Sequence, residues 1–345
     1  MEILTYLESN QKPSLIPTGT LHGSYPLSIP SSPANPLALL QSKTALSPLP
    51  KRWQFLTLTT PELVFGAGFV DLGYITQFFS HLSLESGCAD QRLELALPAL
   101  QFHLNDRPLP GLRAHYKNPL SQSHFSMREE QGEVLFEGTD PKAGFTIQAR
   151  FKIQPLTALT VLGEAVPSYW ASTVKTACLP LSGSLQLKDG RTLSLDGGFA
   201  GLDCTVGFLP RKTQWFWAYA LGKASSNYSN GPIGFNFARG NNLGGMNENA
   251  LWWRDQLIGL PAVRFEKSRH SKKWRVFSEE SSDLAVQLEF HERSRLSNIN
   301  RLGLISSDLV QAYGTFTGTL HLPHSSERIQ IENVPGICED QDVLW

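Results

Sequence analysis

The chain has 345 residues, of which 41% are hydrophobic, 10% aromatic and 18% charged, so it is long enough for two ordinary domains or one large β architecture. Its 30 basic residues against 31 acidic ones leave a net charge of −1, a balance that argues against a nucleic-acid partner or attraction to an anionic membrane surface. No apolar run approaches the ~20 residues that span a bilayer, and no secretory leader opens the sequence, so we expect a cytoplasmic protein without integral membrane association.

Proline dominates the first segment of the chain. Eight prolines lie between Pro13 and Pro50, and they prevent a continuous helix or a central strand. We therefore expect residues 1–50 to form an extended N-terminal arm.

Short apolar, β-branched and aromatic runs separated by turn residues follow from Lys51 onward. This texture predicts strands at 54–58, 62–68, 69–82, 92–104, 133–137, 145–153 and 159–166. The strands make residues 51–167 a first β-barrel-like domain, with its boundary at Pro167 and Ser168.

A second series of strands begins after that boundary and makes residues 168–345 a second β-barrel-like domain. Its clearest unit is a hairpin of residues 184–187 and 192–195 around Lys188-Asp189-Gly190-Arg191. Further strands are predicted at 214–221, 233–237, 250–253, 262–266, 274–278, 284–290 and 312–322, and a helix fits only residues 168–177. Many short strands in regular succession indicate an all-β protein built as antiparallel sandwiches or barrels.

The densest aromatic region of the second half runs from Gly201 to Ala218. Because side chains alternate along a strand, Trp215 and Trp217 share one face while Phe216 occupies the other. That face either lines an aromatic pocket or belongs to the core, with each indole N–H bonded to backbone.

A glycine- and asparagine-rich stretch, residues 227–253, comes next and has no Gly-Lys-Ser/Thr phosphate loop. Glu248 and Asn249 lead into Trp252, so these three residues are candidates for a pocket. The alternative is a solvated turn that positions the following strand.

Two carboxylates are candidates for acid–base chemistry. Asp203 and Glu248 would form a general acid/base pair if the fold brought them together, and a carboxyl group buried among tryptophans would have a raised pKa. Asp71 and Tyr74 are a comparable polar pair in an apolar strand. They either line a site, or Asp71 accepts hydrogen bonds from backbone amides in a bulge.

Other catalytic and binding signatures are missing from the sequence. Four widely spaced cysteines, Cys88, Cys178, Cys204 and Cys338, form no Cys-x-x-Cys pair, and we expect all four thiols to be free. The nine histidines form no zinc motif, and no Gly-x-Ser-x-Gly elbow is present. We therefore expect no metal and no cofactor.

Several motifs together resemble a bacterial family known as domain of unknown function 2804. They are Lys51-Arg52-Trp53, residues 70–74, residues 205–217, residues 247–252 and the closing residues 336–345. That family is similar, more distantly, to tandem lipocalin-like proteins that include carotenoid hydratases, tocopherol cyclase and certain fungal pericyclases.

The resemblance implies two antiparallel calycin- or lipocalin-like barrels with a cavity for an apolar molecule at or between them. It transfers no catalytic residue, although an acidic residue among aromatic rings is the arrangement of the distant relatives.

Three functions therefore remain open. The first is a binding protein or carrier for a hydrophobic small molecule such as a lipid or isoprenoid. The second is a cofactor-independent enzyme that hydrates, cyclises or isomerises such a ligand by acid catalysis, and the third is a structural or interaction protein with filled barrels. The sequence does not define the oligomeric state.

Overall fold

The computed structural model describes residues 19–22, 49–88, 92–96, 102–105, 111–153, 158–166, 169–240, 247–268, 271–278, 286–302, 305–322 and 325–345. Every regular element within these ranges is a β-strand, and the strands form two large, curled antiparallel sheets, which confirms the all-β prediction. Of the predicted N-terminal arm, the described part includes β1 (Gly19–His22), which pairs antiparallel with β12 (Leu159–Val166). The remainder of that arm, up to residue 48, lies outside the described residues.

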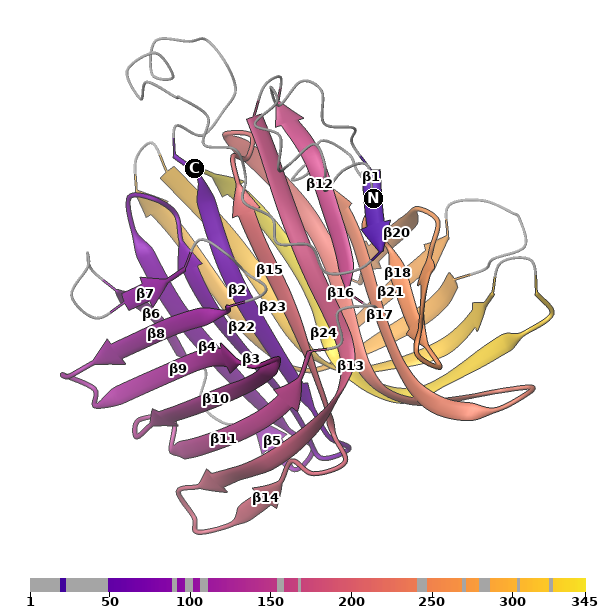
Figure 1. Ribbon diagram of the computed structural model, residues 1–345, viewed down its shortest axis with the longest axis horizontal. Coiled ribbons are helices and arrows are strands. Elements are labelled where there is room, and N and C mark those ends of the chain that lie inside the picture. The colour runs from indigo at the N-terminus through magenta and orange to yellow at the C-terminus, as the bar shows by residue number, and fades with distance from the viewer. Residues whose placement is uncertain are drawn as a thin grey trace.

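The first sheet is built from the N-terminal part of the chain (Figure 1). Its strands follow the order β5 (Gly87–Cys88), β4 (Thr76–Leu84), β3 (Leu63–Asp71), β2 (Lys51–Thr59), β15 (Phe199–Gly207), β13 (Tyr169–Leu187), β11 (Phe145–Lys152), β10 (Glu133–Asp140), β9 (Ser123–Glu130), β8 (Arg113–Asn118) and β7 (Phe102–Leu104). β6 (Arg92–Ala96) pairs with β4, whereas β12 and β14 (Thr192–Ser194) pair with β13.

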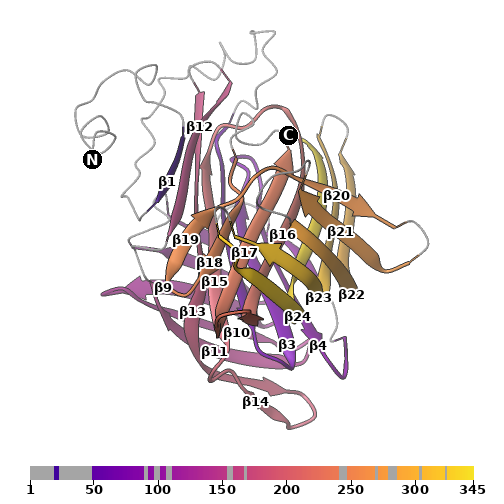
Figure 2. The ribbon, with the colours of Figure 1, turned by 90° about the vertical axis from the view of Figure 1, so that its right-hand side faces the viewer.

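The second sheet contains the C-terminal part of the chain, drawn in orange and yellow in Figure 1 and Figure 2. Its order is β19 (Gln256–Gly259), β18 (Ala250–Trp253), β17 (Asn230–Gly240), β16 (Lys212–Ser226), β24 (Arg328–Leu344), β23 (Ile305–His321), β22 (Val286–Leu302), β21 (Lys273–Ser278) and β20 (Val263–Lys267).

The chain passes from the first sheet to the second between β15, which ends at Gly207, and β16, which begins at Lys212. The domain boundary predicted at 167 falls on residues outside the described ranges and stays a prediction, and β13 and β15, which follow it in the chain, both belong to the first sheet. The helix considered for 168–177 is wrong. That segment opens β13, where β-branched residues such as Thr173 and Val174 suit a strand buried on both faces.

The hairpin predicted at 184–195 is present. Leu185 pairs with Leu193, and Gly190 takes a φ of 86° in the turn, a conformation that glycine adopts without strain.

Apolar side chains gather in three clusters: one inside the curl of each sheet and a third between the sheets. We call the region where the two sheets face each other the junction. Its strands contribute side chains to two clusters at once. On β2, Leu56 belongs to the first sheet's core and Phe55 to the junction, whereas on β16 Ala218 belongs to the second sheet's core and Trp217 to the junction. Burial on both faces explains the nearly continuous apolar sequences of these strands, and it places the candidate site between the sheets.

Candidate functional site

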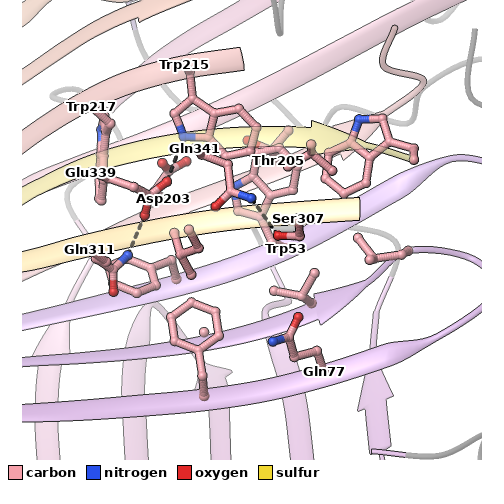
Figure 3. Close-up of a pocket in the computed structure, with 18 of the residues that line it drawn as sticks. Trp53, Gln77, Asp203, Thr205, Trp215, Trp217, Ser307, Gln311, Glu339 and Gln341 are labelled. Atoms are coloured by element: carbon pink, nitrogen blue, oxygen red, sulfur yellow. Dashed lines mark hydrogen bonds between the residues drawn. The ribbon is translucent and has the colours of Figure 1, made fainter. Parts of the chain in front are cut away.

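A cavity of about 290 Å³ lies between the two sheets within the third cluster (Figure 3). Strand register arranges its lining in rows. The inner row of the first sheet consists of Lys175, Asp203, Phe55, Gly68 and Phe79 on neighbouring strands. It faces the second sheet's inner row of Trp217, Glu339 and Gln311. The outer rows, two residues nearer the strand ends, include Thr205, Trp53, Val70 and Gln77 in the first sheet and Trp215, Gln341 and Leu309 in the second.

Two tyrosines close the junction below the inner rows. Tyr219 and Tyr313 occupy the next positions on the same faces of β16 and β23, and both are fully buried. Gly201 and Gly66 make room for them, because a Cβ atom on either glycine would collide with the hydroxyl of Tyr219 or Tyr313, respectively. The inner rows are therefore the floor of the cavity.

A buried ion cluster occupies the floor. Lys175 Nζ lies 2.5 Å from Asp203 Oδ2 and 3.2 Å from Glu248 Oε2, and the Lys175 side chain is only 4% exposed. Thr173 Oγ1 donates to Asp203 Oδ1 at 3.1 Å. Burial alone would lower the pKa of Lys175, but the two carboxylates outweigh this effect and raise it above its usual value. Lys175 is therefore a fixed cation that holds both carboxylates in place.

Glu339 is the third carboxyl group of the floor, and its chemistry differs from that of the ion cluster. Its Oε1 accepts a hydrogen bond from Trp215 Nε1 at 2.6 Å, and its Oε2 accepts one from Gln311 Nε2 at 2.5 Å (Figure 3). Burial raises the pKa of Glu339 from 4.5 to about 7, against the opposing effect of these two hydrogen bonds; Asp203 raises it further, and Lys175 lowers it. A substantial fraction of Glu339 therefore carries a proton at neutral pH.

Aromatic rings line both the walls and the floor of the cavity. Trp53 and Trp215 stack across the two sheets with their centroids 6.3 Å apart and their planes at 12°. Deeper in the cavity, Phe55 meets Trp217 edge-on at 5.7 Å, and Phe79 lies 5.9 Å from Phe55. These faces suit the apolar body of a ligand.

The mouth of the cavity is polar but uncharged. The described residues that line it on β4, β22 and β23 include the amides of Gln77, Asn298 and Asn300 and the hydroxyls of Ser306 and Ser307. Tyr74, 37% exposed, stands at its edge, and burial raises the pKa of this phenol, so that it too is uncharged at neutral pH.

The structure brings five of the eight residues proposed from the sequence to this cavity. Asp203, Glu248, Trp215, Trp217 and Tyr74 line it, and Phe216 points away to pack on Phe265, as strand alternation predicted. The indole nitrogens of both tryptophans donate to side chains rather than to backbone, since Trp217 Nε1 bonds Asn236 Oδ1 at 2.7 Å and Trp215 bonds Glu339.

The other three are not among the residues that line this cavity. Asp71 pairs with Arg52 and accepts a hydrogen bond from the Gly73 backbone N–H at 2.7 Å, as in the alternative considered above. Asn249 turns away from its neighbour Glu248 and bonds the Ala238 N–H and the Pro261 carbonyl. Trp252 is buried in the junction without reaching the cavity.

Sequence reasoning missed Lys175, Glu339 and Gln311 as site residues. Lys175 had a detectable signal, because a single charge stands within the β-branched run Thr173-Val174-Lys175-Thr176. Glu339 was noted only within a closing motif, and its partners Trp215 and Gln311 are 124 and 28 residues away in sequence.

Three of the four cysteines have side chains that the structure describes. Cys178, Cys204 and Cys338 are free, and burial raises the pKa of each thiol, so they are poor nucleophiles. Within the described ranges, no group of three or more His, Cys, Asp or Glu side chains is placed to hold a metal ion, and no helix has the length and apolarity to cross a bilayer.

Comparisons with known proteins place the chain in a family. A family model described as Domain of unknown function (DUF2804) matches residues 42–345. The chain belongs to this family. No curated protein matches its sequence.

Solved structures of similar fold include two of CghA. The match to the crystal structure of CghA with Sch210972 covers 94% of this chain and 94% of the CghA chain, at 10% identity and a TM-score of 0.56. A second crystal structure of CghA covers 94% and 98%, at 10% identity and a TM-score of 0.57. The structure of kievitone hydratase from Nectria haematococca covers 95% and 98%, at 11% identity and a TM-score of 0.46. The likeness of this DUF2804 chain to CghA shows a shared fold.

Proposed function

We propose that this DUF2804 protein binds a hydrophobic small molecule in the cavity between its two sheets. The observation that carries the proposal is the cavity itself, with aromatic rings on both walls and hydrogen-bonding groups at its floor and mouth. Ligand sites in proteins combine an apolar lining with a few well-placed polar groups. The fold shared with CghA, whose structure is known with Sch210972, is consistent with this proposal.

A filled interior fits the observations less well. A purely structural junction would be filled by packed side chains throughout, as it is below the floor, where Tyr219 and Tyr313 are fully buried. One row higher, a cavity remains between the sheets, and its floor carries four acidic or basic side chains: Lys175, Asp203, Glu248 and Glu339.

The first test is native mass spectrometry of freshly purified protein, which detects an apolar compound that co-purifies. The second is a ligand titration in which intrinsic tryptophan fluorescence reports binding. Trp217→Ala removes a large contact face and should weaken binding by about 1–3 kcal/mol. Trp274→Ala is the matched control, because Trp274 is equally buried but belongs to the core of the second sheet. Circular dichroism must show both variants folded at the assay temperature.

The proposal fails if no compound co-purifies and none in a panel of isoprenoids, neutral lipids and fatty acids binds. It also fails if Trp217→Ala and Trp274→Ala lower the affinity equally, because the effect would then report general loosening of the fold.

Catalysis on the bound molecule is a second candidate function, and Glu339 favours it. A carboxyl group with a pKa of about 7 can give a proton to a ligand and take it back near neutral pH. After donation, the Glu339 carboxylate would keep the hydrogen bonds from Trp215 and Gln311, and regaining the proton from product would complete the cycle. Hydration, cyclisation or isomerisation needs no other participant than ligand, water and this proton.

Product analysis separates the two functions. If the protein is an enzyme, Glu339→Gln should abolish turnover with little loss of binding, because glutamine keeps the shape and lacks the transferable proton. Glu248→Gln tests the sequence-based choice of acid, since Glu248 is already engaged with Lys175. Turnover that survives Glu339→Gln and disappears with Glu248→Gln would reassign the acid.

A further inference from the structure

The charge distribution of the cavity bears on which ligands it accepts, an inference that rests on the proposed function. Among the described lining residues, the floor holds three carboxyl groups, Asp203, Glu248 and Glu339, against the single ammonium group of Lys175. Lys175 already lies within 3.2 Å of two carboxylates. A ligand carboxylate at the floor would therefore meet like charges and no available cation.

The mouth offers no alternative cation among the lining residues that the structure describes, since its amides and hydroxyls are uncharged. Lys51 lies behind Tyr74 and Leu72 and does not line the cavity. Its Nζ donates to the Leu72 carbonyl at 2.6 Å, and burial lowers its pKa to about 7, against the effect of Asp71. Arg52 pairs with Asp71, and Arg211 donates to the Trp345 carbonyl.

Besides disfavouring a ligand carboxylate, the floor favours a ligand with a hydrogen-bond acceptor, because of Glu339. Both of its oxygens accept hydrogen bonds from uncharged donors, so its protonated form has an O–H still to donate. The groups around it are Trp215, Gln311, Asp203, Lys175 and Tyr313, and the cavity is the open space beside it. A buried donor is stable when it finds an acceptor.

We propose that the cavity selects an electrically neutral ligand whose hydrogen-bond acceptor, such as an ester, ketone or alcohol oxygen, enters first and meets Glu339, and that it rejects fatty acids. The apolar body then packs against the stacked Trp53–Trp215 pair and the rings of Phe55 and Phe79.

The test compares methyl decanoate, decanoic acid and decane as competitors of the neutral fluorescent dye N-phenylnaphthylamine at pH 6 and 8.5. Decanoic acid is mostly ionised at both, given a carboxyl pKa of about 4–5 in water. The ester should compete on the order of tenfold more strongly than the acid. The affinity of the ester should fall on the order of fivefold from pH 6 to 8.5, because Glu339 loses its proton and can no longer donate to the ester oxygen. For the acid, the ionised Glu339 adds a third carboxylate to those of Asp203 and Glu248.

Two glutamate variants control the interpretation. Glu339→Gln should flatten the pH dependence of ester binding, because an amide donates at every pH. Glu327→Gln should preserve it, because Glu327 is just as buried, 8% exposed, yet bonds Arg254, Trp253 and Ser226 away from the cavity.

Each outcome decides something. Equal or stronger competition by decanoic acid, equal competition by decane, or pH-independent ester binding overturns the selectivity while leaving a ligand-binding cavity. If the dye and all three compounds fail to bind, the proposed function falls and this inference falls with it.

Discussion

Replacing Lys175 with methionine should destabilise the protein strongly, because it leaves two carboxylates buried side by side without their cation. Lys175 is 4% exposed, and its partners Asp203 and Glu248 are 11% and 4% exposed, so solvent screens the cluster little. Breaking a buried ion pair by removing one partner costs about 3–5 kcal/mol. With an unfolding entropy of about 2.1 cal/mol/K per residue over 345 residues, that loss lowers Tm by roughly 4–7 °C for cooperative unfolding.

The assay is thermal and urea unfolding at pH 8. This pH lies below the raised pKa of Lys175 and below the usual pKa of lysine, so the full contribution of the ammonium group is present in the wild type. Lys273→Met is the matched control. Its partner Glu289 lies 2.8 Å away on the surface, both side chains are well exposed, and the loss should stay within about 1 kcal/mol.

A charge-free cluster sharpens the test. The triple variant Lys175→Met, Asp203→Asn, Glu248→Gln should recover most of the lost stability, because no unpaired charge stays buried. The reasoning is refuted if Lys175→Met costs no more than Lys273→Met, or if the triple variant is less stable than the single one.

Three further predictions follow from the cavity and the cysteines. The pKa of Glu339 is about 7 in the folded protein and 4.5 in the unfolded chain, so the free energy of unfolding should fall by about 3 kcal/mol between pH 4.5 and 7. The urea midpoint of Glu339→Gln should lack this dependence on pH, and the prediction is contradicted if wild type and variant change with pH in the same way. A Cβ atom at Gly68 would lie 2.5 Å from the Phe79 ring, which lines the cavity, so Gly68→Ala should displace the ring and weaken N-phenylnaphthylamine binding. Gly259→Ala is the control, because nothing lies within 4 Å of its Cβ position. Equal affinities of the two variants would show that the Phe79 ring moves away from the binding space. Thiol titration under denaturing, non-reducing conditions should count four free cysteines, and a count of two or zero would reveal a disulfide.

Local periodicity made part of this site predictable. Trp215 and Trp217 share a face because strand alternation is a property of neighbouring residues, and β16 follows it through the aromatic run. Adjacency in sequence was a weaker guide after Glu248, because residues 247–249 are not in a strand and Asn249 bonds Ala238 and Pro261 instead. Trp252, in β18, is buried without lining the cavity.

Long-range register was not predictable from one sequence. Lys175 lies on β13 of the first sheet, whereas Glu248 precedes β18 of the second sheet, so the two meet only because the fold brings these distant segments together. The helix considered for 168–177 also hid the significance of Lys175, because the charge is unusual only within a strand buried on both faces. The assignment of β13 and β15 to the first sheet is likewise a matter of pairing, because they resemble the later strands in composition.

The position of the charged floor within the junction is itself an argument for function. Replacing a buried ion pair with well-packed apolar side chains is often neutral or stabilising, so Lys175, Asp203 and Glu248 are not needed to hold the sheets together. Apolar closure is available in this fold, since Tyr219 and Tyr313 achieve it one row below. Lys175 and Glu339 both have raised pKa values and line a cavity, a combination that is typical of functional sites. Substitutions of Glu339 at the floor should therefore change ligand binding or its pH dependence.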